Sequence, residues 1–307
     1  MAALTSPYNN ADAQTAGLRL AAILHNEVSL LLADRASLRN HEAIVDYGDI
    51  SGRGSATLEI PLLGLDGYDE MSSVAESADP AATDLSNASP SITIARYVIE
   101  RQITDLLRLT NSGGGPNLEL LVGDVAGAFD MAVTTAICAL FGSFSNSVGT
   151  TTVDLSVDDF MAGVFQLEQS NVNGRPIAVL APVQVSDLQS SLRQEGGPLQ
   201  YVSATQELIA MKGQGFVGSF AGVDIFKSSK VATSTGRQGA LFVRGAIGFA
   251  SGVAPMDAGL DGFIQNNGPV SIEFERTNGA YTTVYGQAYF GVAEIQDSMG
   301  VLIETDA

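Results

Sequence analysis

Apolar residues recur at helical spacing in two long segments of the chain. In residues 12–33 the apolar positions lie three or four residues apart, at Leu20, Ile23, Leu24, Val28 and Leu31. Residues 116–141 carry the same spacing and begin with a proline, which suits the first turn of a helix. The first segment predicts an amphipathic N-terminal helix, and the second predicts a long helix whose uncharged second half is buried.

Shorter apolar runs predict strands in other parts of the chain. Residues 57–62 and 92–99 predict two strands that pair as an antiparallel ribbon. An isolated two-stranded ribbon is marginally stable in water, so this one needs another surface to lie on. Beyond residue 213 the pattern predicts strands at 216–226, 240–250, 270–276 and 281–295, and the Asn-Gly pair at 278–279 indicates a type I′ hairpin.

A helix, a strand and a second helix are predicted between residues 156 and 195. Ser156, followed three residues later by Asp159, fits a capping box ahead of an apolar helix face. Residues 176–180 form a short apolar run typical of a buried strand, and Pro182 is placed to begin the next helix. This alternation predicts an α/β layer.

The composition narrows the class of protein. The 307 residues include 33 Gly, and 15 Lys and Arg stand against 34 Asp and Glu, for a net charge of −19. The Gly content favours a strand-containing fold over a helical bundle, and the single cysteine, Cys138, allows no intrachain disulfide. Lysine occurs only at Lys212, Lys227 and Lys230, so the chain has no basic arm for nucleic acid.

We expect neither an export signal nor a membrane span. The first eight residues lack the cationic and apolar regions of a signal peptide. The uncharged run at residues 131–153 is long enough to cross a bilayer, but it is rich in Thr, Ser, Asn and Gly. The sequence therefore predicts a soluble, intracellular protein with no membrane partner.

Candidate chemistry is sparse. A G-x-G-x-x-G pattern at residues 213–218 precedes a predicted strand rather than a helix, so it indicates a Gly-rich turn and not a nucleotide-binding loop. The acid pairs Asp69-Glu70 and Asp158-Asp159 are typical of a solvated face or of the start of a helix. The two histidines are expected at the surface. We predict no catalytic residue, no cofactor and no metal site.

The segment from residue 41 to residue 90 is strongly acidic and poor in large apolar residues. It contains ten acidic residues and one arginine, a net charge of −9. Such a segment cannot build a core of its own. We therefore expect the first hundred residues to bury themselves on neighbouring subunits of an assembly.

The order of these pieces resembles the major capsid proteins of tailed bacteriophages, whose Hong Kong ninety-seven fold is shared with encapsulin shells. The resemblance covers nearly the whole chain and rests on order and spacing. Residues 57–62 are similar to the first strand of the extended loop, 91–109 to its return strand, 116–141 to the spine helix, 156–195 to the helix, strand and helix of the axial domain, 218–225 to the next axial strand, and 285–292 to the closing strand of the peripheral domain.

The resemblance implies an α+β fold with an N-terminal arm, an extended β-hairpin loop, a long spine helix, and peripheral and axial domains. The implied division of the chain is 1–40 for the arm, 41–95 for the extended loop, 96–152 for the peripheral domain with the spine helix, 153–265 for the axial domain, and 266–307 for the return strands of the peripheral domain.

It also implies a function and a set of partners. The chain would self-assemble as hexamers and pentamers into an icosahedral shell that encloses double-stranded DNA without sequence-specific contacts. A separate scaffolding protein is expected because the arm begins by residue 12, together with a portal protein and a possible cement protein. The implied location is the virion capsid, assembled in the host cytoplasm. Shells of some relatives are locked by an isopeptide bond from a loop lysine, but this chain has no lysine before Lys212.

Nine residues are candidates for intersubunit contacts. They are the loop acids, the basic residues nearest to them in sequence, and two apolar residues of the arm: Glu59, Asp66, Asp69, Glu70, Arg96, Arg101, Arg108, Ile23 and Leu24. Three other functions stay open at this point. A cellular encapsulin-type compartment shares the fold, a β-rich surface or adhesin protein would explain the acidity, and an unrecognised hydrolase would need a convergent pocket.

Overall fold

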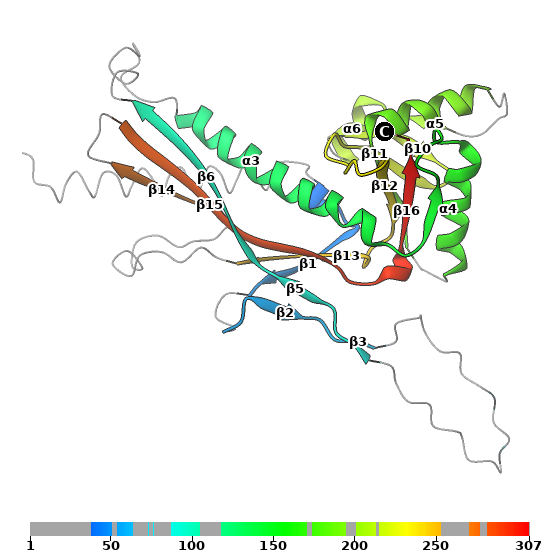
Figure 1. The fold of residues 1–307 in the computed structure, drawn as a ribbon, viewed down its shortest axis with the longest axis horizontal. Coiled ribbons are helices and arrows are strands. Elements are labelled where there is room, and N and C mark those ends of the chain that lie inside the picture. Colours follow the sequence, from blue (N-terminus) through cyan, green and yellow to red (C-terminus); the bar gives the residue numbers. More distant parts are fainter. Residues whose placement is uncertain are drawn as a thin grey trace, which may run out of the picture.

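The computed structural model describes residues 38–50, 54–63, 73, 76, 87–104, 118–170, 174–194, 201–212, 215–252, 270–276 and 281–306. These residues form two β-sheets with flanking helices and a small ribbon (Figure 1). The helix expected at residues 12–33 and the turn at residues 278–279 lie outside the described residues.

The first sheet has five strands, and the longest strand pairs with three of the others. Its strands are β1 (Ile44–Asp49), β6 (Ala95–Thr104), β13 (Ile247–Gly252), β14 (Val270–Arg276) and β15 (Tyr281–Glu294). Strand β15 pairs antiparallel with β6, β13 and β14, and β1 adds in parallel to β13. The strands expected at 270–276 and 281–295 are confirmed. Both carry apolar residues at the spacing that a buried sheet face requires.

The long helix α3 (Leu118–Ala139) lies along this sheet (Figure 1). The ring of Phe129 meets the edge of Phe290 on β15 with centroids 5.5 Å apart. The helix approaches closely at Gly286, where a Cβ would lie 2.8 Å from a methyl group of Val125. The second half of α3 is buried at Val133, Ile137 and Cys138, but Met131 and Thr135 are exposed. The expectation that this uncharged half is buried therefore holds for one face of the helix only.

The uncharged run at 131–153 does not continue as one helix. Helix α3 ends at Ala139 and is followed by the 3₁₀ turn η2 (Phe141–Ser143) and strand β7 (Ser147–Gly149). The stretch Gly123–Ser143 is long and apolar enough to cross a membrane by composition alone. Its apolar side chains instead contribute to the core beneath the five-stranded sheet.

The second sheet has seven strands and three helices beside it. Its strands, in spatial order, are β7, β16 (Gly300–Thr305), β12 (Arg237–Phe242), β8 (Ile177–Leu180), β11 (Val223–Lys227), β10 (Phe216–Phe220) and β9 (Val202–Ser203). The helices are α4 (Val157–Gln169), α5 (Pro182–Gln194) and α6 (Gln206–Lys212).

Strand β8 is buried on both faces, which explains its unbroken apolar sequence. Ala178 and Leu180 pack in the cluster that includes the apolar residues of α4 and α5. Ile177 and Val179 point the other way, into the cluster formed with α3. The expected helix, strand and helix between residues 156 and 195 are confirmed.

Two of the strands expected beyond residue 213 are each divided in the structure. Residues 216–226 form the antiparallel hairpin β10–β11, whose turn has positive φ at Ala221 and Gly222. Residues 240–250 contain the end of β12 and the start of β13, which belong to different sheets. Gly245, with φ +105°, allows the chain to turn between them. The single-strand interpretation was wrong because apolar residues stand on both sides of each turn.

Because the turn at Gly245 separates β12 and β13 into different sheets, sheet membership does not follow the domain boundaries expected from the sequence. Residues 153–265 supply β13 to the five-stranded sheet, although the other strands of that range lie in the seven-stranded sheet. The C-terminal part, residues 266–307, supplies β14 and β15 to the first sheet and β16 to the second. The chain therefore contributes strands to both sheets in turn. It crosses from one sheet to the other at residues 243–246 and 295–299.

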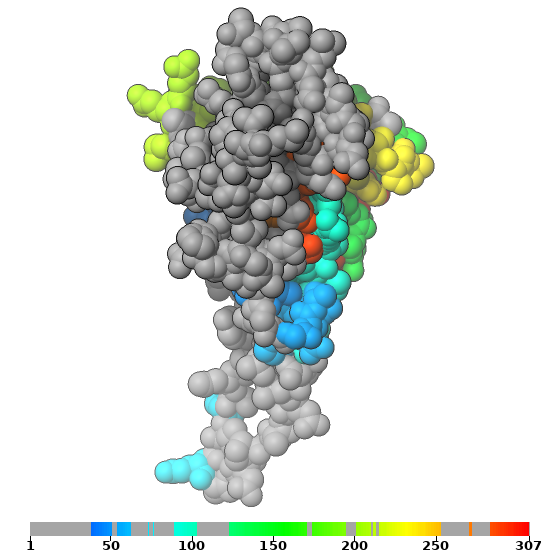
Figure 2. Space-filling view, turned by 90° about the vertical axis from the view of Figure 1, so that its left-hand side faces the viewer, coloured from blue at the N-terminus to red at the C-terminus, as the bar shows by residue number. Residues whose placement is uncertain are grey.

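The ribbon is made of four short strands. They are β2 (Thr57–Glu59), β3 (Leu62–Leu63), β4 (Asn87–Ala88) and β5 (Ser91–Thr93), with β2 paired to β5 and β3 paired to β4. The expected antiparallel pairing is confirmed for Thr57–Glu59 with Ser91–Thr93. Residues 95–99 of the strand expected at 92–99 belong to β6 and pair with β15 instead. In the space-filling view the blue residues of the first strands lie below the cyan and orange residues of β6 and β15 (Figure 2).

The base of the ribbon is buried on its own subunit. Ile60 and Ile92 form a small apolar cluster with Ile50, Ala250 and Ile295. This cluster supplies the surface that an isolated ribbon lacks. The expectation that the first hundred residues bury themselves only on neighbours is therefore too broad, because the part at 54–63 and 87–93 has a partner within the chain.

Candidate assembly surface

Only part of the expected interface lies among the described residues. Asp66, Asp69, Glu70, Arg108 and the arm residues fall outside them. The arm residues are Ile23 and Leu24. Glu59 is described at the end of β2, where its side chain is exposed. Its position on the ribbon leaves it open to contact from another molecule.

Two of the three arginines named from the sequence are bound within their own subunit. Arg96 donates from Nε and Nη2 to the side-chain oxygen of Gln287, at 3.2 and 2.9 Å. Arg101 donates from Nε and Nη2 to the two carboxylate oxygens of Asp124, at 2.6 and 3.2 Å. The hydrogen bond and the charge of Asp124 raise the pKa of Arg101. Arg96 therefore joins β6 to β15 within the sheet, and Arg101 joins β6 to helix α3.

Helix α4 carries an exposed apolar pair that the sequence analysis did not identify. Met161 and Phe165, one helical turn apart, are 41% and 58% exposed. The adjoining face of the helix is buried through Phe160, Val164 and Leu167. An exposed Phe at a position that the core does not need is typical of a contact surface.

The structure brings the three lysines of the chain to one pocket of about 920 Å³. We call it the lysine pocket and define it by Lys212, Lys227, Lys230, Met131 and Met211, which line it together with residues of η1 (Leu38–Asn40), α3, β8 and β11. The sequence shows only that lysine is rare. It gives no sign that α6 and the end of β11 meet beside the middle of α3.

One lysine of this pocket is part of a buried ion pair. Lys212 Nζ lies 2.5 Å from Asp224 Oδ2, and Arg175 Nη2 lies 3.1 Å from Asp224 Oδ1. The Asp224 side chain is almost fully buried, so the two cations compensate the cost of burying its charge. Lys212 is therefore a structural residue at the floor of the pocket.

The histidine of the pocket is not a plain surface residue, contrary to expectation. The ring of His41 packs edge-on against Phe226 with centroids 4.8 Å apart. Its Nδ1 accepts a hydrogen bond from the backbone nitrogen of Ala43 at 3.2 Å. Burial lowers the pKa of His41, so the imidazole is neutral at physiological pH and adds no charge to the pocket.

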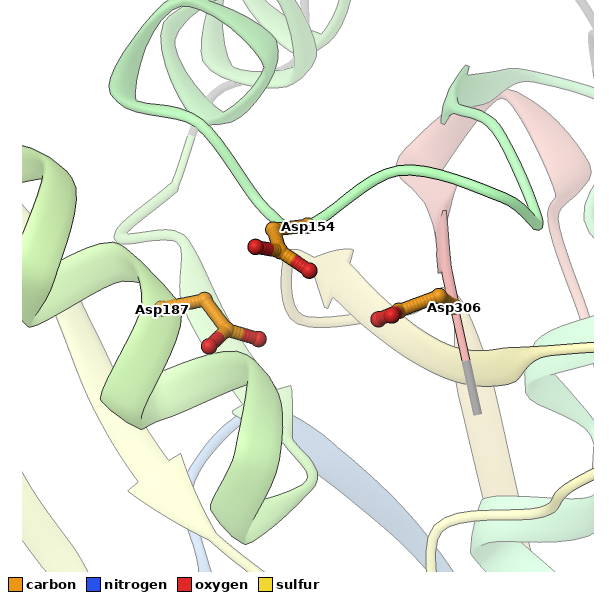
Figure 3. Close-up of side chains that lie close together, drawn as sticks. All are labelled: Asp154, Asp187 and Asp306. Carbon is orange, nitrogen blue, oxygen red and sulfur yellow. The ribbon is translucent and has the colours of Figure 1, made fainter.

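Three carboxylates converge at one end of the seven-stranded sheet (Figure 3). Asp154 precedes α4, Asp187 lies on α5 and Asp306 follows β16, with ligand atoms within 4.8 Å of one another. Burial, followed by the charges of Asp154 and Asp306, raises the pKa of Asp187. Carboxylates are the ligands that hard cations prefer. Convergence alone does not identify a ligand, and we assign none.

The G-x-G-x-x-G pattern leads into strand β10 of the seven-stranded sheet. Gly215 lies in the turn before β10 with φ +95°, and Gly218 lies within β10. A Cβ at Gly218 would be 2.5 Å from the carbonyl oxygen of Val202, so glycine permits β9 to pair there. The strand that follows confirms a Gly-rich turn and excludes the nucleotide-binding geometry, which requires a helix.

The acid pair Asp158-Asp159 begins helix α4. Ser156 is the N-cap, and its Oγ accepts a hydrogen bond from the backbone nitrogen of Asp159 at 3.1 Å. Both carboxylates lie in the first turn, where the helix dipole favours negative charge. The capping role expected for this sequence is confirmed.

Comparisons with known proteins find likeness only at the level of structure. No family model matches the sequence, and no curated protein matches it. The capsid of Cyanophage P-SCSP1u is 13% identical and covers 88% of each chain with a TM-score of 0.61. The capsid of Ralstonia phage GP4 is 12% identical and covers 88% of this chain and 90% of that chain with a TM-score of 0.60.

A cellular shell protein belongs to the same set of neighbours. The SrpI encapsulin of Synechococcus elongatus PCC 7942 is 11% identical and covers 85% of this chain and 84% of that chain, with a TM-score of 0.57. At such identities the likeness establishes the fold and not the function. The chain therefore has the α+β Hong Kong ninety-seven capsid fold, as the order of its sequence segments predicts.

Proposed function

We propose that this chain is the major capsid protein of a tailed bacteriophage, a structural protein rather than an enzyme. Its copies assemble as hexamers and pentamers into an icosahedral shell that encloses double-stranded DNA. The observation that carries the proposal is the structural match to the phage P-SCSP1u capsid over 88% of both chains, with a TM-score of 0.61. A match over so much of both chains leaves little room for a different functional domain.

The surface of the described residues supports a role in assembly. The ribbon extends from the body of the subunit and ends in strands too short to be stable without neighbours (Figure 1). Met161 and Phe165 expose apolar area on α4. Many such modest contacts, made at once around a closed shell, stabilise an assembly that no single pair of subunits could hold.

The net charge of −19 suits a wall around packaged DNA. A strongly basic inner wall would hold phosphates through counterion release, and DNA could not slide past it. The proposal includes a separate scaffolding protein, a portal protein and a possible cement protein as partners. Assembly would take place in the host cytoplasm, and the final location would be the virion capsid.

An encapsulin-type compartment is the second candidate, supported by the likeness to the SrpI encapsulin. The full chain should be expressed alone and with a candidate scaffolding protein, then examined by sedimentation and negative-stain microscopy. Closed shells or rings of capsomer size support the proposal, and monomers under every condition contradict it. Nuclease-protected DNA in shells from the native source indicates a virus, whereas an enclosed protein cargo indicates the encapsulin alternative.

A further inference from the structure

We propose that His41 is a proton-sensitive clasp, which holds the start of strand β1 against the seven-stranded sheet at neutral pH and releases it in mild acid. This inference goes beyond the proposed function, because it concerns the single subunit and not its assembly. His41 lies between η1 and β1, and β1 belongs to the five-stranded sheet. Its ring packs on Phe226 of β11, which belongs to the seven-stranded sheet. The side chain therefore connects the two sheets.

Three hydrogen bonds form a tight turn around His41. Its backbone nitrogen donates to the carbonyl oxygen of Leu38 at 3.2 Å, and its carbonyl oxygen accepts from the backbone nitrogen of Ile44 at 3.0 Å. The third bond runs from the backbone nitrogen of Ala43 to Nδ1 of the imidazole at 3.2 Å. A ring nitrogen accepts a hydrogen bond only when it carries no proton, so the third bond requires the neutral ring with its proton on Nε2.

Protonation of the ring removes the third bond. The added proton goes to Nδ1, which then faces the backbone N–H of Ala43 as a second donor. Ala43 is 1% exposed, so water does not reach it to replace the lost acceptor while the turn is closed. A buried donor left without a partner costs more than the bond itself contributed. Opening of the turn into water relieves that cost.

The charges around the ring do not compensate a third cation at this place. The groups that act on it are Glu42 beside it in the chain, Asp224 of β11, Lys212 of α6 and Arg175 before β8. The other charged residues that line the pocket are Asp130 of α3, Lys227 and Lys230. Asp224 already binds two cations, and Glu42 is exposed, where water screens its charge. Burial outweighs these charges and lowers the pKa of His41.

The clasp therefore weakens as pH falls. Above about 6.5, the ordinary pKa of histidine, the ring is neutral whether the turn is closed or open, and the clasp has its full strength. Below that pH the open turn exposes the imidazole and binds a proton that the closed turn lacks. The opening equilibrium then shifts by up to about tenfold for each pH unit, until the lowered pKa of the closed state is reached.

Replacement of His41 with asparagine separates the hydrogen bond from the proton. An asparagine side-chain oxygen accepts from the backbone nitrogen two residues on, as Nδ1 of His41 does, and takes up no proton in this pH range. The matched control is His25→Asn, which changes the only other histidine of the chain. Hydrogen exchange of residues 41–49 is measured by mass spectrometry from pH 5 to pH 7.5. The data are corrected for intrinsic exchange rates and taken where sedimentation shows one assembly state throughout.

The wild type and His25→Asn should lose protection at residues 41–49 by at least about threefold between pH 7.5 and pH 5.5. His41→Asn should start with lower protection, because it lacks the ring contact with Phe226, and should show no such loss on acidification. Asp187 and Glu294 have raised pKa values, which give pH dependences of the opposite sign, but all three proteins share them. An equal loss in the wild type and His41→Asn would overturn the proposal, and so would a wild type without any loss.

Nitrogen chemical shifts of labelled histidine in the wild-type subunit test the clasp without a variant at residue 41. We expect His41 to have a bare Nδ1 and a protonated Nε2 at pH 7.5, and to titrate below 6.5. The second histidine signal is identified by its absence from His25→Asn. A proton on Nδ1 at neutral pH would overturn the proposal. Titration of His41 above 6.5 would overturn it as well, because it would show that Phe226 and the nearby acids stabilise the charged ring in the closed turn.

Discussion

Gly291 on β15 lies directly against the backbone of Thr93 on β5. A Cβ at Gly291 would be 2.3 Å from the carbonyl oxygen of Thr93 and 3.0 Å from a methyl group of Ile92. Glycine at this position lets the ribbon seat on the sheet. The completely buried Ile92 side chain then packs with Ile60, Ala250 and Ile295. The direction in which the ribbon leaves the subunit depends on this contact.

Replacing Gly291 with alanine should move the ribbon and destabilise the subunit. Backbone atoms cannot yield as a flexible side chain does, so we expect a loss of roughly 1–3 kcal/mol, the usual cost of overpacking a core. The measurement is urea unfolding of the isolated subunit. Gly123→Ala is the matched control, because nothing lies within 4 Å of a Cβ there. In helix α3 that change should stabilise by up to about 1 kcal/mol. Equal effects of the two changes would contradict the prediction.

The pKa of Asp187 predicts how stability depends on pH. Burial and the charges of Asp154 and Asp306 raise this pKa in the folded state above its ordinary value. Between the ordinary and the raised pKa the folded state binds more protons than the unfolded state, so the stability contributed by Asp187 falls as pH rises through that window. Asp187→Asn should therefore stabilise the subunit at pH 7 and have little effect near pH 3.

The measurement is the thermal midpoint of wild type and variant from pH 3 to pH 7. Asp158→Asn is the control, because Asp158 is an exposed acid in the first turn of α4. Its removal should cost a few tenths of a kcal/mol at pH 7, since it loses a favourable interaction with the helix dipole. An Asp187→Asn variant that is less stable than wild type at pH 7 would show that the three carboxylates attract a cation or hydrogen-bond one another instead.

Much of the fold could be predicted from local sequence patterns. Helix α3 and strands β8, β14 and β15 each carry a long periodic or apolar signal, and the Ser156 cap marks the start of α4. The crossing at Gly245 could not be predicted, because Leu241, Phe242 and Val243 continue the apolar run up to the turn. Local hydrophobicity reports burial and does not say in which of two sheets a strand lies.

The candidate surface depends on contacts between distant residues. Lys212 meets Lys227 and Lys230 because α6 and β11 converge beside α3, and nothing in their separate sequences signals this. The pair Arg101 and Asp124 is separated by 23 residues and joins a strand to a helix. Proximity in sequence suggested Arg101 as a partner for the loop acids. In the folded subunit Arg101 instead pairs with Asp124 of the same chain.

A denaturing gel tests how the shell is held together. An isopeptide bond between subunits requires the ε-amine of a lysine, and the lysines of this chain are confined to the lysine pocket, with none in residues 41–95. We therefore expect boiled particles to give a single band near the chain mass of 31.9 kDa. A ladder of covalent oligomers that resists reducing agents would contradict non-covalent assembly.

The exposed apolar pair on α4 predicts a variant that folds and does not assemble. The Phe165 side chain is 58% exposed, whereas Phe160 and Val164 on the adjoining face of α4 are buried, so Phe165→Asp removes little core packing. Burial of a Phe side chain against a neighbour contributes about 1.5–3 kcal/mol at each contact, and a ring of copies repeats that loss at every interface. We expect soluble subunits with a wild-type thermal midpoint and a shell yield at least about tenfold lower.

Gln169→Asp, which introduces the same charge at another exposed position of the helix, should assemble normally. Phe160→Asp should instead unfold the subunit, because Phe160 is fully buried. Normal shells from Phe165→Asp would show that this face of α4 stays in solvent in the assembly.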